Sequence, residues 1–212
     1  MKRIWGSVAL FGALLACLGM SRAGEKGFKS LFNGKNFDGW KFEIGKGDPE
    51  KTFMVHNGVI VVSGHPNGYF YTDKSYKNYI VRFDWRYKRP KGLEDDEKFN
   101  GNSGLLVHIQ EPHKVWPKCV EVQGMNKEHA KIFAIGGAKG KFSFDAKALK
   151  DARKPVGEWN TTEAIVKDGA ITSKVNGVTI STGKSNLTEG PFGFQSEGAE
   201  IHFKNIKIKV LD

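Results

Sequence analysis

Short stretches of alternating apolar and polar residues, separated by turn-forming dipeptides, constrain this chain more than any other sequence feature. Residues 160–185 contain three such stretches, interrupted at Asp168-Gly169 and Asn176-Gly177. Strand side chains alternate between two faces, and Asn-Gly or Asp-Gly supplies the positive φ angles of a tight hairpin turn. Asn57-Gly58 marks another hairpin. No apolar period typical of a substantial helix persists, and one helical turn is expected over 147–154.

The remaining strand signals follow the same spacing along the chain. Roughly a dozen short strands at this spacing favour an all-β fold of two packed antiparallel sheets, a β-sandwich or jelly roll. In the last strand the apolar residues change phase, which predicts a β-bulge near Asn205. No linker-like composition divides residues 24–212, so we expect one domain. Further strands are expected at 68–72, 79–88, 105–110, 118–123, 132–135, 190–196 and 199–210.

The first 23 residues have the pattern of an export signal. Lys2 and Arg3 precede an apolar run, and Ser21-Arg22-Ala23 suits cleavage after Ala23. The run is interrupted by Gly and Ser, which disfavours an uncleaved membrane span. We therefore expect the mature domain in the periplasm or outside the cell. The alternative is lipidation of Cys17, which would tether the protein to a membrane surface.

Charge and cysteine content limit the partners. The chain has 33 Lys and Arg against 23 Asp and Glu, a formal net charge of +10. The lysines are scattered, without an arginine-rich helix or zinc-ligand spacing, so no nucleic acid partner is expected. After cleavage the chain keeps Cys119 alone, which excludes an internal disulfide. Cys119 is expected to be a small buried hydrophobe.

Three central strand segments carry polar side chains opposite their apolar rows. In residues 79–88 the odd positions are apolar or aromatic and the even positions are mostly charged. In 105–110 and 118–123 the core is expected to contain Val107, Ile109, Val120 and Val122. If the three strands were neighbours in one sheet, their polar side chains would share one surface. These side chains are Arg82, Asp84, Arg86, His108, Gln110, Glu121 and Gln123.

Such a surface suits a sugar. Sugar hydroxyls need planar polar partners, and sugar C–H faces need an aromatic ring, for which Trp116 is the candidate. Two carboxylates, or a carboxylate and a histidine, can act as general acid and base when one is held protonated. Glu121 and His108 could instead hold a divalent metal ion. The competing interpretation is that these residues only solvate one face of an antiparallel sheet.

Six motifs occur in order within residues 28–210: SLFNGKNFDGWK, NSGLLVHI, HKVWPKCVEVQG, GEWNT, VNGV and GPFGFQSEGAEIHFKNIKIK. Together they resemble the 3-keto-disaccharide hydrolase family. The resemblance implies a bacterial, exported, concanavalin A-like jelly roll that acts on glycosides oxidised at C3. The ketone acidifies the C2 hydrogen, so a base can remove it while an acid assists departure of the group at C1. Water then adds to the enone, and the glycosidic bond is cleaved.

The resemblance places the family's acidic residue at Glu121, with Gln123 on the same face of the strand. His108 stands where many relatives have Arg. We predict three catalytic residues: Glu121 as base or metal ligand, His108 as partner acid and Asp84 as second carboxylate. The alternatives are a noncatalytic carbohydrate-binding jelly roll and a structural or adhesive surface domain. The predicted substrate-binding residues are Gln123, Arg82, Trp116, Lys118, His113, Asn102 and Gln110.

Overall fold

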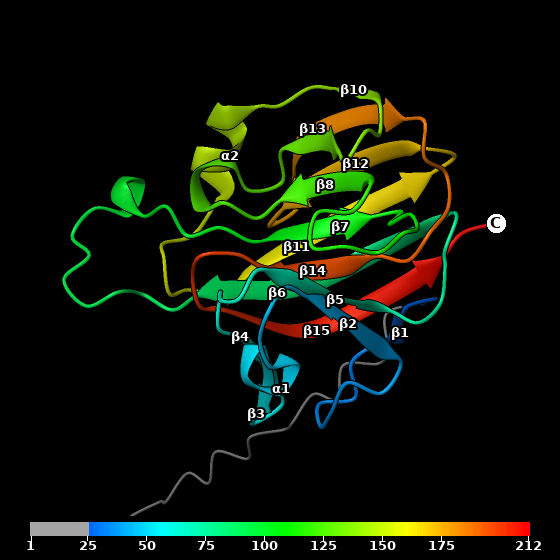
Figure 1. Ribbon diagram of the computed structural model, residues 1–212. Helices are drawn as coiled ribbons and strands as arrows, with labels where there is room; N and C mark the ends of the chain where they lie inside the picture. The colour runs from blue at the N-terminus through cyan, green and yellow to red at the C-terminus, as the bar shows by residue number, and fades with distance from the viewer. Residues whose placement is uncertain (1–25) are drawn as a thin grey trace, which may run out of the picture.

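The computed structural model describes residues 26–212 as two antiparallel β-sheets that pack face to face (Figure 1). The predicted β-sandwich is therefore confirmed. The expected export signal and the lipidation site at Cys17 lie outside the described residues. In the described part of the chain, no helix is long and apolar enough to cross a membrane.

The larger sheet, within residues 26–212, has nine strands in the order β10-β13-β12-β11-β6-β15-β4-β3, and β1 pairs with β15. All its pairings are antiparallel. Its strands are β1 (Lys29–Ser30), β3 (Phe53–His56), β4 (Val59–Val62), β6 (Tyr79–Tyr87), β10 (Gly140–Phe142), β11 (Asn160–Lys167), β12 (Ala170–Val175), β13 (Val178–Ser185) and β15 (Ile201–Val210).

The smaller sheet has six strands among the described residues, in the order β2-β5-β14-β7-β8-β9. Its strands are β2 (Trp40–Ile44), β5 (Gly68–Thr72), β7 (Gly104–Val107), β8 (Cys119–Gln123), β9 (Ile132–Ile135) and β14 (Gly193–Ser196). The helices are short: α1 (Pro49–Thr52), α2 (Ala146–Ala152) and the 3-10 turns η1 (Asp96–Lys98) and η2 (Asn126–Glu128).

Local sequence signals position the hairpins as predicted. Asn57, Asp168 and Asn176 each have a φ of 49°, and each is followed by a positive-φ glycine in a turn between paired strands. Asn205 has a φ of 53°, and the pairing of β15 with β6 shifts register between Lys204 and Lys207. The predicted bulge is confirmed. It lets apolar side chains on both sides of Asn205 face the same core.

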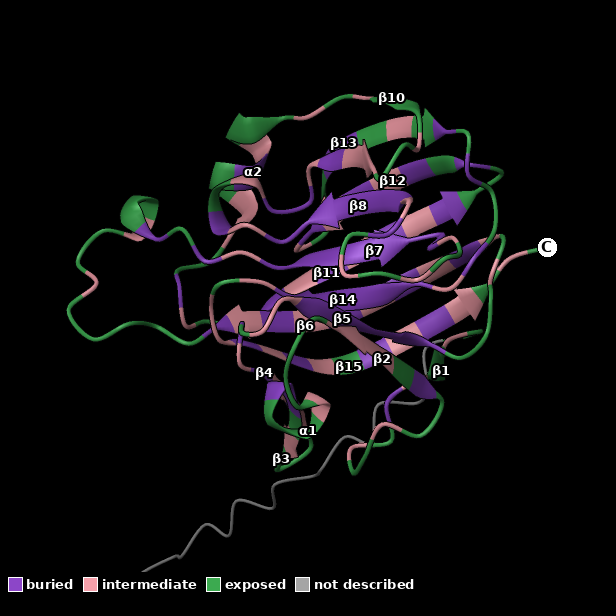
Figure 2. Ribbon diagram, viewed as in Figure 1, coloured by how far each residue is buried: buried purple, intermediate pink, exposed green. Residues whose placement is uncertain are grey.

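The core lies between the sheets. The five odd residues of β6, Tyr79 to Tyr87, are all buried, as the alternation predicted. Phe83 packs edge-on against Phe194 of the opposite sheet, with 4.8 Å between ring centroids. Figure 2 shows a second feature: β5, β7, β8 and β14 are buried throughout, on both faces. The outer face of the six-stranded sheet is therefore covered.

The prediction that the three polar segments lie side by side in one sheet is wrong. β7 and β8 are neighbours in the six-stranded sheet, but β6 belongs to the nine-stranded sheet. Residues 88–103, between β6 and β7, carry the chain from one sheet to the other. Sheet partnership depends on contacts between distant residues, which alternation within a single strand does not specify.

Candidate functional site

The candidate site lies on the outer face of the six-stranded sheet, and β8 supplies its centre. Val120 and Val122 point into the core, so Glu121 and Gln123 point to the outer face. Glu121 is opposite Leu106 of β7 and Phe133 of β9. Apolar neighbours on both sides leave the Glu121 side chain 4% exposed.

A pocket of about 350 Å³ opens over this part of the sheet. It brings together four of the predicted residues, Asn102, Trp116, Glu121 and Gln123, and we call it the candidate site. Trp116 is 44% exposed although it lines the pocket. Asn102, Trp116, Glu121, Gln123, Phe133, Ile135 and Glu197 line the pocket.

Glu197 is the acidic residue that the sequence interpretation missed. It follows β14 directly and pairs through its backbone with Asn102. Phe192 and Phe194 face the core, so continued alternation places Gln195 and Glu197 toward the outer face. That signal was present in the GPFGFQSEG motif. It was overlooked because only polar residues of the three central segments were considered.

The two carboxyl groups of the candidate site are electrostatically coupled. Burial raises the pKa of Glu121 to about 8, and the negative charge of Glu197 adds to the rise. Burial also raises the pKa of Glu197, while hydrogen bonding from Asn102 opposes that rise. At neutral pH Glu121 is therefore largely protonated. A protonated carboxyl beside a second carboxyl is an arrangement suited to general acid and base chemistry.

At and directly behind the lining of the site lie buried polar atoms that form no well-aligned hydrogen bond among the described residues. They are Glu121 Oε1 and both Nε2 and Oε1 of Gln195. Buried polar atoms are normally hydrogen-bonded, so such a group at a pocket is a candidate ligand contact. Gly104 makes room for them: a methyl group there would collide with Gln195 Oε1 and lie 2.7 Å from Glu121 Oε1.

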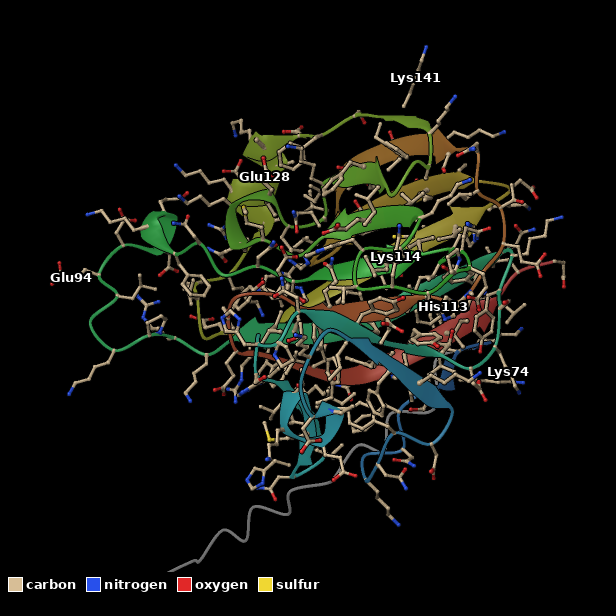
Figure 3. The ribbon with its side chains drawn as sticks, viewed as in Figure 1. Lys74, Glu94, His113, Lys114, Glu128 and Lys141 are labelled. Atoms are coloured by element: carbon tan, nitrogen blue, oxygen red, sulfur yellow. The ribbon has the colours of Figure 1, made fainter. Side chains whose placement is uncertain are left out.

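The loop between β7 and β8 crosses the outer face of the sheet. Its base is closed by Gln110 N, which donates to the Lys118 carbonyl over 2.9 Å. The His113 ring packs edge-on against Tyr71, and its Nδ1 lies 2.9 Å from the Tyr71 hydroxyl. Figure 3 shows His113 and Lys114 in front of the six-stranded sheet. The loop thus buries the middle of the sheet and brings Trp116 to the candidate site.

His108 does not face Glu121, contrary to prediction. Its φ of 55° interrupts the alternation of β7, and its ring is fully buried beside Tyr79. Nδ1 lies 3.2 Å from the Leu187 carbonyl and Nε2 lies 3.3 Å from the Lys77 carbonyl. Burial lowers the pKa of His108, although these carbonyls oppose the shift.

The same interruption reverses the face of the next residue. Ile109 is buried, but in a small outer-face cluster with Tyr69, Tyr71, Leu106 and Cys119 rather than in the predicted core. The expectation of a buried Cys119 is confirmed, because the thiol has no exposed surface.

Asp84 and Arg82 lie on the outer face of the other sheet, so the structure does not bring them to the candidate site. Asp84 Oδ1 accepts a hydrogen bond from Thr161, and Oδ2 accepts one from Asn205, both over 2.7 Å. Arg82 Nε donates to Glu163 over 2.9 Å. The predicted roles of Asp84 as second carboxylate and Arg82 as substrate contact do not fit this position.

Three predicted binding residues lie near the candidate site but outside its lining. Gln110 and His113 line a second pocket of about 600 Å³ on the other side of the loop. The Gln110 amide donates to the His108 and Glu189 carbonyls, over 2.9 and 2.8 Å. Lys118 lies at the end of the loop and is partly buried.

The proposed metal pair does not fit the arrangement. Glu121 and His108 face different surroundings, and both His108 nitrogens are directed at backbone carbonyls. Within residues 26–212, no group of three or more His, Cys, Asp or Glu side chains is placed to hold a metal ion.

Comparison with known proteins decides the family. The model of the 3-keto-alpha-glucoside-1,2-lyase-like domain matches residues 27–209, nearly all of the described chain. The chain belongs to this family. The resemblance that the sequence motifs indicated is thereby confirmed, and a glycosyl hydrolase-like domain is identified.

Individual relatives agree with this assignment. A 3-keto-disaccharide hydrolase from Bacteroides thetaiotaomicron is 22% identical over 241 residues, which cover 88% of this chain and 79% of that protein. A solved structure from Parabacteroides distasonis, with a provisional glycosyl hydrolase assignment, has a TM-score of 0.62 and 26% identity over 88% of this chain and 95% of its own.

A carbohydrate-binding module from Bacillus subtilis shares the fold alone, with a TM-score of 0.54 and 13% identity over 81% of this chain and 95% of its own. The jelly-roll architecture predicted from the sequence is thus confirmed. Because this architecture occurs both in a binding module and in a provisionally assigned hydrolase, the reaction has to be argued from the site.

Proposed function

We propose that this protein cleaves glycosides whose sugar carries a ketone at C3, by elimination followed by hydration. The observation that carries the proposal is the pair of carboxyl groups in one pocket, Glu121 and Glu197, of which Glu121 is almost completely buried. The family and the B. thetaiotaomicron relative support the substrate class.

Glu121 acts as the general acid. Its environment favours the neutral carboxyl, because Phe133 and Leu106 flank it and the charge of Glu197 lies nearby. The protonated side chain delivers its proton to the glycosidic oxygen as the bond to C1 breaks. This role replaces the base expected from the sequence, since a buried carboxyl that retains its proton at neutral pH is a poor base.

Glu197 acts as the general base. Its side chain is less buried than that of Glu121 and is steadied by Asn102, so it ionises first of the pair. The carboxylate accepts the C2 proton, which the adjacent ketone makes acidic. After the leaving group departs, the two side chains reverse their roles while water adds across C1 and C2.

Trp116 supplies the apolar surface of the pocket. Its ring is exposed at the rim, where it can stack on the C–H face of a sugar. Gln123 also lines the pocket, and its Oε1 accepts hydrogen bonds from Gly124 N and Met125 N, over 2.7 and 2.9 Å. These bonds hold the turn that follows β8.

The test uses a purified chain starting at residue 24, because residues 1–23 are the expected export signal. A 3-keto-disaccharide and the same disaccharide without the ketone are incubated with it, and released sugars are quantified. We expect cleavage of the oxidised compound alone. Glu197→Gln should reduce kcat at least about 100-fold, because a general base is lost. An intact 3-keto-disaccharide would refute the proposal.

The exposed Trp116 also favours a second candidate function, noncatalytic binding of glycan. In that case Glu197→Gln would leave affinity nearly unchanged and no product would form with any substrate. Trp116→Ala would weaken affinity most. Calorimetric titration with the unoxidised and oxidised disaccharides distinguishes the two functions.

A further inference from the structure

Gln195 is an almost completely buried polar residue beside the carboxyl pair, and the proposed reaction does not yet use it. The side chain is 1% exposed, and neither Nε2 nor Oε1 forms a well-aligned hydrogen bond among the described residues, although its contact with Glu121 opposes the burial-driven rise in the pKa of that carboxyl. An amide normally makes several hydrogen bonds, and leaving it unpaired in the interior is destabilising. That cost is offset if a ligand supplies the missing partner.

Three neighbouring strands direct Gln195 toward the reacting carboxyl group. β14 supplies Gln195, β7 supplies Gly104 and β8 supplies Glu121. The two side chains converge above Gly104, where a Cβ atom would collide with Gln195 Oε1 and lie 2.7 Å from Glu121 Oε1. Ser103 helps to fix β14, because its hydroxyl donates to the backbone carbonyl of Gln195 over 2.9 Å. The backbone of Gln195 is therefore fixed by the sheet, and its amide lies against Glu121.

We propose that Gln195 is a further catalytic residue, which donates its amide N–H to the C3 carbonyl oxygen of the sugar and stabilises the enolate. This inference rests on the proposed function, because only a 3-keto-sugar develops charge on that oxygen. A preorganised donor in a water-poor pocket contributes more to an oxyanion than to a neutral carbonyl. Gln195 accordingly acts on the transition state more than on binding.

The elimination moves one electron pair from the C2–H bond to the departing oxygen at C1, with the negative charge on the C3 oxygen in between. Glu197 takes the C2 proton, and the electron pair of the C2–H bond forms the C2–C3 double bond, which moves charge to the C3 oxygen. The charge then returns: C3 regains its carbonyl, a double bond forms between C1 and C2, and the C1–O bond breaks. Glu121 protonates the departing oxygen. No oxidant or reductant is consumed.

The test isolates the enolate step. A 1,5-anhydro-3-keto-hexitol has the ketone and the C2 hydrogen but no leaving group at C1, so it can exchange that hydrogen without being cleaved. In D2O, proton NMR follows loss of the C2 signal. The wild-type protein should catalyse this exchange. Glu121→Gln should keep the exchange and lose disaccharide cleavage, because the acid is needed only when the C1–O bond breaks.

Gln195→Met and Gln195→Leu both remove the amide N–H donor, and Met does so at nearly constant size. For each variant we expect about a 100-fold fall in the exchange rate and in kcat for cleavage, with KM changed less than about threefold. Asn186→Asp is the matched control, because Asn186 is exposed and its side-chain oxygen, which accepts from Lys139 N, is retained. Thermal melting verifies that each variant is folded.

The outcomes separate the two hypotheses. If both Gln195 variants fold and keep the exchange rate within about threefold of wild type, Gln195 is not the oxyanion donor, although the proposed function stands. A rise in KM at unchanged kcat would equally overturn the inference, since it would show uniform binding. If wild-type protein neither exchanges nor cleaves 3-keto-sugars, the proposed function itself fails.

Discussion

The outer faces of the two sheets both carry many polar residues, yet they differ in how those residues are satisfied. On the nine-stranded sheet, the even residues of β6 are half-buried and each charged side chain there has a protein partner. On the six-stranded sheet, Glu121 and Gln195 are almost completely buried. Glu121 Oε1 and both polar side-chain atoms of Gln195 form no well-aligned hydrogen bond among the described residues.

Mutual pairing on the nine-stranded face leaves little for a ligand to gain. Glu163 forms ion pairs with Arg82 and with Lys174, the latter over 3.2 Å. Trp159 is held between cations, with Lys204 Nζ 4.0 Å and the Arg86 guanidinium 4.6 Å from its ring centroids. By contrast, the covered face concentrates desolvated groups. Buried polar side chains that lack hydrogen-bond partners therefore mark a candidate site better than the number of charged residues does.

Glutamate-to-glutamine changes on the two faces should have the largest difference in effect. Glu121→Gln removes the proposed acid and should lower kcat about 10³-fold, within the range of general acid catalysis. Glu163→Gln, the matched change on the nine-stranded face, should leave kcat within about twofold. Initial rates with a 3-keto-disaccharide measure both. An equal loss of kcat in the two variants would show that the two outer faces do not differ in function.

The sequence specified the turns and the local strands better than it specified which strands meet. Asn57, Asp168, Asn176 and Asn205 carry strong local preferences for positive φ, so the hairpins and the bulge could be predicted. Partners in a sheet are chosen by packing between distant segments. The position of β6 in the other sheet was therefore not visible in its own alternation.

The candidate site was predictable in part, for the same reason. Glu121 and Trp116 share a short sequence window, so they were grouped correctly with the pocket that they line. His108 was misplaced because one residue with a φ of 55° reverses the strand face, and a single histidine is only a weak signal of that conformation. Glu197 was missed because it lies 76 positions after Glu121 in the chain, directly after β14.

A methyl group at Gly104 tests whether the side chains of Glu121 and Gln195 must pack directly above this residue for activity. Gly104→Ala would push apart Glu121 and Gln195, and a misplacement of about 1 Å can cost about 100-fold in rate. The control is Gly45→Ala, because a methyl group there meets its nearest atoms at an ordinary 3.8 Å. Crystal structures and rates of both variants measure the effect. Full activity of Gly104→Ala would contradict the proposed convergence.

The pH dependence of activity should reflect the raised pKa of Glu121. Because the acid must be protonated, kcat should decline as pH rises through about 8. Above that value each further pH unit should lower kcat about tenfold. The decline is measured by initial rates from pH 6 to 10, with circular dichroism to verify folding. A constant rate up to pH 10 would contradict the role of Glu121 as acid.

Stability should respond to pH with opposite sign on the two faces. Burial raises the folded-state pKa of Glu121 to about 8, so its ionisation costs stability as pH rises from about 4.5 to 8. Glu121→Gln should therefore exceed wild type at pH 9, by roughly 1–3 kcal/mol, and match it near pH 4.

Glu163 should show the reverse. Burial alone would raise its pKa, but hydrogen bonds from Arg82 and Lys174 lower the pKa overall. Its contribution to stability is present above the unfolded value and lost on acidification. Glu163→Gln should thus be less stable than wild type at pH 7, and the difference should shrink toward low pH. Urea unfolding at several pH values measures both variants, and parallel pH profiles would contradict the contrast.

The two tryptophans give the smallest expected effect, and they separate binding from chemistry. Trp116 lies exposed at the rim of the candidate site, so Trp116→Ala should raise KM about tenfold, as loss of one stacking contact of about 1–1.5 kcal/mol predicts, with kcat nearly unchanged. Trp159 lies between Arg86 and Lys204 on the opposite face. Trp159→Ala should leave KM unaltered, whatever it costs in stability. If Trp159→Ala raised KM as much as Trp116→Ala, the sugar would have to contact the nine-stranded sheet. The proposed contrast between a face of paired charges and a ligand-binding face would then be wrong.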